Sequence, residues 1–538
     1  MRVLLMHRER DLDIRPELRD ELFEAMRGGD PIELAHAWRT RERTTGSADA
    51  PLAPVQRALV DDLELDTVWR AMAAGDPFLY ETARRVILSS LRDPQEILYR
   101  QAVMRDCLER RAVVRELHQL AIEALESERR MGVLWSHATP DSVLRRSVGV
   151  LTRYLDALRG LRRLAGEHAR DFRSPGFTRL FAMLGDELDD EYLGAMERRL
   201  AELRFERGLL ESAALGMGDR GRDYVVHLRR ERHWTERLPF RDRGASCGFT
   251  IPPRDENGFR ALDELRARGV GRVADAVARS ADHVKGFFAM LRLELAFYVA
   301  CLNLQDALEA GGAVTCIPEP AEGTRALSAG GLYDVSLALH LDGRVVANDL
   351  DADGRSLVMI TGANQGGKST FLRAAGLAQL MLQCGMPVGA AWLRADPVSG
   401  VFTHYKREED ARMEGGKLDE ELQRMSEIAD SIAPGALLLC NESFASTNER
   451  EGSEIARQVV RAMRARGIRV IFVTHMYDLA HGLYREADDA ALFLRPERAP
   501  DGRRTFRLHE GEPQTTSYGP DSYERIFGHA LLDRRGAA

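Results

Sequence analysis

The sequence predicts a mixed fold, in which a long helical region precedes an α/β nucleotide-binding domain with a largely parallel sheet. A glycine-rich motif, residues 362–369, follows the apolar run Leu357–Ile360 and leads into a helical pattern. Strand-like runs alternate with helical stretches after that motif, as in α/β domains. Between about residues 61 and 310, apolar side chains recur at helical spacing.

The glycine-rich motif has the spacing of a phosphate-binding loop, G-x-x-x-x-G-K-[ST]. Glycines let backbone N–H groups close around phosphate oxygens, and the N-terminus of the following helix favours an anion. We expect Lys368 to reach the β- and γ-phosphates of ATP and the Ser369 hydroxyl to bind Mg²⁺. The residues expected to contact the nucleotide are Gly362, Ala363, Asn364, Gln365, Gly366, Gly367, Lys368, Ser369 and Thr370. The alternative is a glycine-rich turn without a ligand, but the motif and its flanking pattern agree with a nucleotide site.

Composition limits the classes of protein to which the chain can belong. Its 538 residues suggest about three or four domains. With 76 Lys and Arg against 84 Asp and Glu, the net charge is -8, so any contact with nucleic acid must come from a local basic patch. The six cysteines are scattered without a C-x-x-C pair, which is typical of reduced thiols in a cytoplasm. Charged residues interrupt the longest apolar run, so we expect neither a membrane span nor a signal peptide.

The helical region has the pattern of an arm. We interpret residues 1–60 as a small N-terminal segment and linker, and residues 61–310 as a helical core and lever. Asp93, Pro94 and Glu96 predict a helix start, and residues 174–176 predict a break. Helical periodicity lapses between about residues 214 and 257, then returns in a long helix with one apolar face. This order predicts that helices lead the chain to a reduced tip and that one long helix returns from it, with the apolar face of that helix packed in a core.

Four arginines at the expected tip could touch a phosphate backbone. They are Arg229, Arg230, Arg232 and Arg237. Glu231, Glu236 and Asp242 dilute this charge, so a solvated charged hairpin is at least as good an interpretation.

From residue 311 to 538 the composition indicates the α/β domain. Residues 314–317 and 333–341 are rich in strand formers, and they lead into the phosphate loop. Strand-like runs follow at residues 398–403, 436–440 and 469–474.

Polar residues stand where two of these runs end. Asn441 and Glu442 occupy the places where such NTPases put a Mg²⁺-associated carboxylate and a glutamate that orients the attacking water. An amide keeps an oxygen ligand but lacks the full charge, so we expect Asn441 to weaken Mg²⁺ binding or slow turnover while ATP binding is retained. His475 follows the third run and could sense or stabilise the γ-phosphate, although an ordinary surface or packed histidine is the alternative.

Several segments resemble the MutS mismatch-repair ATPases. They are residues 346–350, 360–370, 401–404, 441–452, 473–475 and 517–519, with a weaker likeness in residues 62–66 and 93–101. The resemblance implies an ABC-type ATPase domain in which ATP lies between two subunits and controls a DNA clamp carried on lever helices. It also implies roles for Asn364 in the phosphate loop, Glu442 as catalytic glutamate, residues 446–451 as the loop at the dimer interface and His475 as a switch.

The chain departs from that family in three places. No Phe is followed two positions later by Glu, the pattern of the wedge that reads a mispaired base, and residues 1–60 are too few for the domain that carries it. Residues 413–422 replace the expected Ser-Thr-Phe loop with a Gly-Gly-Lys segment. The segment after Gly528 is short for a helical dimerisation element.

These observations predict an ATPase, with slow hydrolysis because of Asn441, that uses ATP and Mg²⁺ to switch a homodimer on branched or other non-mismatch DNA. The alternative is a nucleotide-sensing scaffold that binds ATP and a protein partner without DNA. Asn441 and the net acidity favour the scaffold, whereas the family layout and the arginine cluster favour DNA. An unrelated phosphotransferase fits less well, since no acceptor-activating Asp motif stands beside Glu442 and His475.

Overall fold

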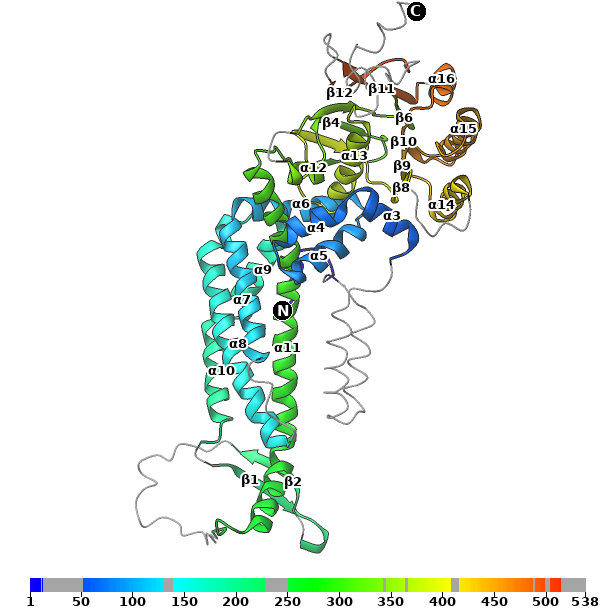
Figure 1. Cartoon of the computed structure of the whole chain (residues 1–538). Coiled ribbons are helices and arrows are strands. Elements are labelled where there is room, and N and C mark those ends of the chain that lie inside the picture. Colours follow the sequence, from blue (N-terminus) through cyan, green and yellow to red (C-terminus); the bar gives the residue numbers. More distant parts are fainter. Residues whose placement is uncertain are drawn as a thin grey trace, which may run out of the picture.

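The structure is a computed structural model. It describes residues 1–10, 12, 52–129, 139–206, 208–219, 221–227, 250–341, 345–362, 366–407, 416–486, 489–498 and 504–513. A helical arm runs from a small hairpin at its tip to a region of stacked sheets and helices (Figure 1). The fold is therefore mixed, with helices and sheets, as the sequence predicted.

The arm and its base are built from a single long helix, α11 (Glu256–Ala310), and the helices that precede it in the chain. The preceding helices are α3 (Pro54–Asp62), α4 (Leu65–Ala73), α5 (Pro77–Leu88), α6 (Pro94–Glu109), α7 (Arg111–Arg129), α8 (Pro140–His168), α9 (Pro175–Glu187) and α10 (Asp190–Glu202). Helix α11 packs along α7 and α8 in the arm and against α4 and α5 at the base. By length and composition α11 could cross a membrane, but 72% of its most apolar window is buried inside the protein. It therefore has the character of a core helix, and its apolar face packs as the sequence predicted.

Polar residues before several helices fix where those helices begin. The side chain of Asp93 accepts the N–H of Gln95 at 2.9 Å and caps α6, which confirms the predicted start. Ser174 accepts the N–H of Phe177 and caps α9, which confirms the predicted break. Such caps satisfy N–H groups that the first turn of a helix leaves without partners.

The tip of the arm is an antiparallel hairpin of β1 (Leu210–Leu215) and β2 (Gly221–His227). Helix α11 begins at Glu256, close to residue 257, the predicted end of the irregular segment. Arg229, Arg230, Arg232 and Arg237 lie outside the described residues. Their role in DNA binding stays a prediction.

The first residues of the chain pack into the base of the arm. Leu5 and Met6 are fully buried, and their N–H groups donate to Glu294 of α11 at 2.5 and 3.2 Å. Arg100 of α6, itself buried, donates to the carbonyls of Met6 and Cys384, each at 3.3 Å. Leu5 and Met6 are thus part of the core at the base of the arm, a role that the sequence did not predict.

Two sheets form the region beyond the arm. One has the order β12-β11-β6-β10-β9-β8 and the other β3-β7-β4-β5. The strands of the first sheet are β6 (Leu357–Ile360), β8 (Val401–Tyr405), β9 (Leu437–Asn441), β10 (Arg469–Val473), β11 (Ala491–Arg498) and β12 (Arg504–Glu510), and those of the second are β3 (Glu319–Pro320), β4 (Leu327–Leu332), β5 (Asn348–Asp351) and β7 (Trp392–Ala395). Every pairing in the first sheet is parallel except that of β11 with β12, so the predicted largely parallel sheet is confirmed.

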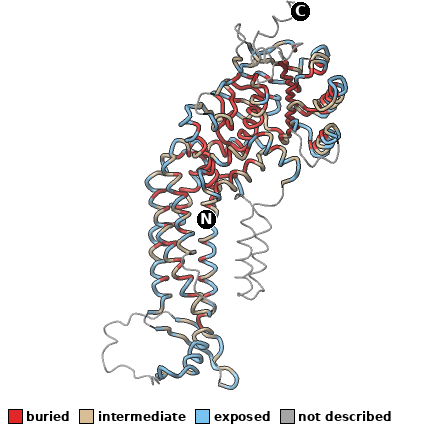
Figure 2. Tube along the Cα trace, viewed as in Figure 1, coloured by how far each residue is buried: buried red, intermediate tan, exposed pale blue. Residues whose placement is uncertain are grey.

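Helices cover both faces of the first sheet (Figure 1). Helix α13 (Lys368–Gln383) lies on the face toward the arm, and α14 (Lys417–Ser431), α15 (Glu449–Ala465) and α16 (Tyr477–Arg485) lie on the other. Successive side chains of a strand point to opposite faces. Accordingly, Val358 and Ile360 belong to the core that continues into the arm, and Leu357 and Met359 to the core under α14–α16. Figure 2 shows the buried residues concentrated in this region and at the base of the arm.

One predicted strand is wrong. Residues 333–341 are rich in strand formers, yet they contain helix α12 (Val335–His340). The side chain of Asp334 accepts the N–H of Leu337 at 3.1 Å and caps this helix, in which Leu337, Ala338 and Leu339 are good helix formers. Residues 314–317 contribute only an isolated bridge at Cys316, and β8 begins at Val401 rather than residue 398.

Candidate nucleotide-binding site

Three neighbouring parallel strands end at the same edge of the main sheet. In the order β6-β10-β9, Val473 pairs with Ile360 on one side and with Asn441 on the other. The glycine-rich loop, the pair Asn441 and Glu442, and Thr474 with His475 therefore emerge side by side. Parallel sheets bind ligands at the carboxyl ends of their strands.

Two glycines of the loop have conformations that a side chain would oppose. Gly362 and Gly367 have φ values of 112° and 85°. A Cβ atom on Gly362 would lie 2.8 Å from the Cδ atom of Pro496. Because Gly367 occupies the N-cap position of α13 and has no side chain, it leaves the first N–H groups of this 16-residue helix open to an anion. Ala363, Asn364 and Gln365 lie outside the described residues.

Lys368 begins α13 and is almost fully buried. Its Nζ atom donates to the carbonyl of Gly362 at 2.8 Å, across the loop. Burial lowers the pKa of Lys368, and the nearby Glu442 carboxylate acts in the opposite direction. A buried ammonium that spans the loop is placed to interact with phosphate oxygens.

Ser369 and Asn441 are in direct contact. The Ser369 hydroxyl donates to the Oδ1 atom of Asn441 at 2.9 Å. Mg²⁺ prefers oxygen ligands and keeps several waters and phosphate oxygens. A hydroxyl and an amide oxygen at this distance fit such an ion, with Ser369 and Asn441 as its protein ligands. Among the described residues, no group of three His, Cys, Asp or Glu could hold a metal by itself.

Glu442 and His475 form a second pair at the same edge. Glu442 has a positive φ of 53°, and its N–H donates to the carbonyl of Val473 at 2.9 Å. His475 Nδ1 lies 3.7 Å from Glu442 Oε1, and both side chains are partly exposed. Contact with His475, followed by smaller effects of Lys368 and Lys406, lowers the pKa of Glu442 despite its partial burial. Glu442 is therefore a carboxylate at neutral pH, open to solvent and close to Lys368.

The buried His404 contacts Ser443, the residue that follows Glu442. The Nδ1 atom of His404 lies 2.7 Å from the Ser443 hydroxyl, and its Nε2 atom lies 3.0 Å from the carbonyl of Glu421 in α14. Burial and Arg424 lower the pKa of His404 to about 4, so the ring is neutral. Ser446 donates to the Glu421 carboxylate at 3.0 Å, which joins α14 to the loop after Glu442. The sequence suggested no role for His404 or Glu421.

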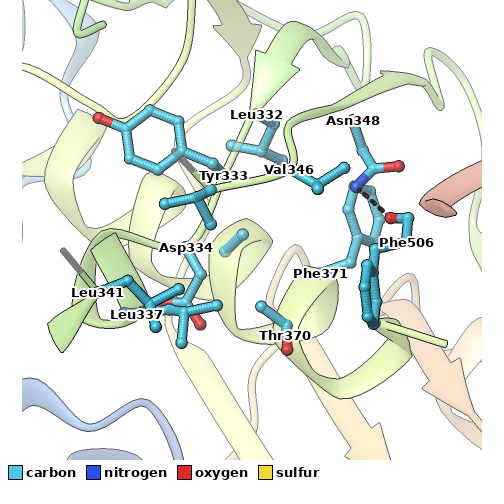
Figure 3. Close-up of a pocket in the computed structure, with 13 residues that line it drawn as sticks. Leu332, Tyr333, Asp334, Leu337, Leu341, Val346, Asn348, Thr370, Phe371 and Phe506 are labelled. Carbon is cyan, nitrogen blue, oxygen red and sulfur yellow. Dashed lines mark hydrogen bonds between the residues drawn. The ribbon is translucent and has the colours of Figure 1, made fainter. Parts of the chain in front are cut away.

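An apolar pocket of about 420 Å³ adjoins the start of α13. Figure 3 shows Val346, Phe371, Phe506 and two leucines of the α12 segment around it, with Thr370 at its base. Asn348 fixes one wall, because it donates to the Phe506 carbonyl at 3.2 Å and accepts the N–H of Leu508 at 2.7 Å. Apolar walls with a few polar groups are typical of sites for small molecules and cofactors. A nucleotide with phosphates at α13 could place its base here.

The structure thus brings together five residues that the sequence singled out, Lys368, Ser369, Asn441, Glu442 and His475. Gly362, Gly366, Gly367 and Thr370 belong to the same loop and helix start. The sequence analysis missed the pocket, whose walls come from segments on both sides of the loop. The one feature of the sequence that pointed to this pocket was the resemblance of residues 346–350 to a known family.

Comparison with known proteins identifies similar chains. The family model of the MutS2 N-terminal domain matches residues 92–311, and that of MutS domain V matches residues 358–505. The chain is 32% identical to an endonuclease MutS2 of Anaeromyxobacter sp. over 212 residues, or 37% of this chain and 25% of that protein. It is 29% identical to a DNA mismatch repair protein MutS of Porphyromonas gingivalis over 246 residues, or 42% of this chain and 27% of the other. The matched part thus spans about a quarter of the length of these curated relatives.

Proposed function

Because the chain belongs to the MutS family, we propose that it is a DNA-binding ATPase in which ATP switches the helical arm. The observation that carries this proposal is the convergence of Lys368, the Ser369–Asn441 contact and the Glu442–His475 pair at one sheet edge. Each supplies one requirement of phosphoryl transfer: a cation on the phosphates, oxygen ligands for a metal, and a carboxylate for the attacking water.

Binding would use the start of α13 and the apolar pocket. The open N–H groups of α13 and the Lys368 ammonium would bind the phosphates, while Phe506 and its neighbours would enclose the base. Ser369 and Asn441 would hold Mg²⁺, which neutralises charge on the transferring phosphate. Glu442 would orient a water molecule and accept its proton, and His475, beside it, would contact the terminal phosphate.

Asn441 is the residue that we expect to lower the Mg²⁺ affinity of the site. We predict that Asn441→Asp lowers the Mg²⁺ concentration for half-maximal ATP hydrolysis about tenfold, because a carboxylate attracts the cation more strongly than an amide does. A Mg²⁺ titration of steady-state turnover measures this. Unchanged Mg²⁺ dependence in Asn441→Asp would exclude Asn441 as a metal ligand.

The curated relatives carry names that refer to mismatch repair and to an endonuclease. For this chain we propose contact with DNA, preferentially branched or otherwise lacking a mispair, through an arm formed by residues 61–310 with a tip near 214–257. Residues 311–538 would form the ATPase domain, and residues 1–60 would precede the arm. We further propose a homodimer in which residues 446–451 face the partner's nucleotide.

The test is the binding of labelled homoduplex, mismatched and branched DNA at two salt concentrations, with and without ATP. Lys368→Ala is expected to weaken ATP binding about 10- to 100-fold, because it removes a buried cation from the phosphate site. DNA binding should respond to ATP in the wild type and not in this variant. It should also weaken with salt, because DNA contacts release counterions. A preference for mismatched DNA would overturn the non-mismatch proposal.

A second candidate function follows from Asn441 and from the net charge of -8. Both favour a scaffold that binds ATP and a protein partner without DNA. Tight ATP binding with no DNA binding in any nucleotide state would support the scaffold and contradict the DNA switch.

A further inference from the structure

Helix α12 lies between the apolar pocket and the arm. Leu337 of α12 lines the pocket, and so do Asp334, just before the helix, and Leu341, just after it (Figure 3). The same helix packs against α4 and against the long helix α11. A ligand in the pocket would therefore touch an element that also contacts the arm.

An arginine connects this element to the phosphate-loop helix. Arg373 lies on α13 beyond Lys368, and its Nε atom donates to Asp334 Oδ2 at 2.5 Å. Its Nη1 atom donates to the carboxylate of Glu64, at the start of α4. The Asp334 side chain is fully buried and that of Arg373 is 16% exposed, so little solvent screens their contact. One guanidinium thus joins α13, the α12 segment and α4.

Glu64 is also attached to α12 through its backbone. Its carbonyl accepts a hydrogen bond from the Ser336 hydroxyl at 3.3 Å. The residue has a left-handed conformation, with φ 51° and ψ 41°. Such a conformation is costly for a residue with a side chain, and it persists where surrounding contacts enforce it. Glu64 is therefore held on two sides, by α13 and by α12.

We propose that Glu64, Arg373 and Asp334 form a joint through which the pocket, when a base fills it, sets the position of the arm. The joint rests on the proposed function, because it transmits occupancy of the proposed nucleotide site. Filling the pocket fixes the spacing between α12 and α13. Arg373 and Ser336 carry that spacing to Glu64, and α4 carries it to α11, against which it packs. Glu64 is a positioning residue that touches neither the pocket nor the phosphate loop.

The joint predicts that the base matters as well as the phosphates. Inorganic tripolyphosphate can occupy the phosphate loop but cannot fill the apolar pocket. With ATP, amide hydrogen exchange in α4 and in the part of α11 beside it should slow in the full chain. With saturating tripolyphosphate, exchange in the phosphate loop should slow while exchange in α4 and α11 stays as in the free protein.

Glu64→Gln tests the joint separately from ATP binding. We expect this variant to bind ATP within about twofold of the wild type, and to lose at least about four-fifths of the ATP-induced slowing in α4 and α11, because coupling between sites is carried by such discrete contacts. Arg373→Lys should give a partial loss, since one ammonium cannot hold both carboxylates as a guanidinium does. The matched control is Glu486→Gln, which removes a carboxylate of similar exposure, 47% against 44% for Glu64, from an ion pair with Arg461 away from the arm.

The outcomes separate the joint from the proposed function. If the wild type binds ATP without any change in α4 or α11, the proposed switch itself fails. If the wild type responds and Glu64→Gln responds equally, the joint is overturned while the switch stands. An equal response of α4 and α11 to tripolyphosphate and to ATP would likewise overturn the joint, because the base would then carry no signal. Unchanged exchange of α8 in the variants checks that the arm remains folded.

Discussion

ATP turnover is expected to fall about 10²- to 10⁴-fold when Glu442 is replaced with glutamine, while ATP affinity stays within a few-fold of the wild type. The carboxylate is ionised at neutral pH, because His475 lies 3.7 Å away and lowers its pKa, with Lys368 as a further cause. An ionised, partly exposed carboxylate can accept a proton from water, whereas an amide of the same shape cannot. The phosphate contacts proposed for Lys368 and the start of α13 do not involve this side chain.

Single-turnover hydrolysis and equilibrium ATP binding, measured on the same preparation, test this prediction. If Glu442 is the general base, hydrolysis becomes the slow step in Glu442→Gln. This variant should therefore bind ATP and leave it intact for the time of many wild-type turnovers. A variant that hydrolyses ATP at the wild-type rate would exclude Glu442 as the general base. Loss of binding together with turnover would mean that Glu442 shapes the phosphate site instead.

Strand periodicity predicted the main sheet well, because its strands are short apolar runs bounded by turn residues. Strand β6 begins and ends where the sequence indicated, and β9 and β10 are displaced by one residue at most. Helix α12 was missed although Leu337, Ala338 and Leu339 favour helices, because the helix is short and its start depends on a cap at Asp334. Local propensity does not register a cap whose carboxylate is also fixed by Arg373 from another helix.

The part of the site that depends on strand ends could also be predicted, because parallel strands place their carboxyl ends at one edge. This reasoning selected Asn441, Glu442 and His475. It could not select His404, whose contacts reach Ser443 and Glu421 from a neighbouring strand, or Phe506, which joins the pocket from the far end of the chain. Such contacts depend on tertiary packing between distant segments, which periodicity and local propensity do not reveal.

The second large effect is expected at Glu294, in the C-terminal half of α11. This side chain is fully buried and accepts the N–H groups of Leu5, Met6 and Leu12. We expect Glu294→Ala to lower the free energy of unfolding of the helical part by about 3–5 kcal/mol. Each buried N–H group left without an acceptor costs about 1–3 kcal/mol, and this substitution removes the acceptor of all three N–H groups.

Native-state hydrogen exchange of α6 and α11 measures this loss in the full chain. Glu264→Ala, on an exposed face of the same helix, is the matched control and should change the free energy by less than about 0.5 kcal/mol. Equal protection in Glu294→Ala and the wild type would mean that the contacts of residues 1–12 with α11 add no stability.

Arg100 connects the first residues of the chain to α13. It donates to the carbonyl of Met6 and to the carbonyl of Cys384, the residue after α13. Loosening the segment should therefore raise exchange at the C-terminal end of α13 before it affects the phosphate loop at the other end.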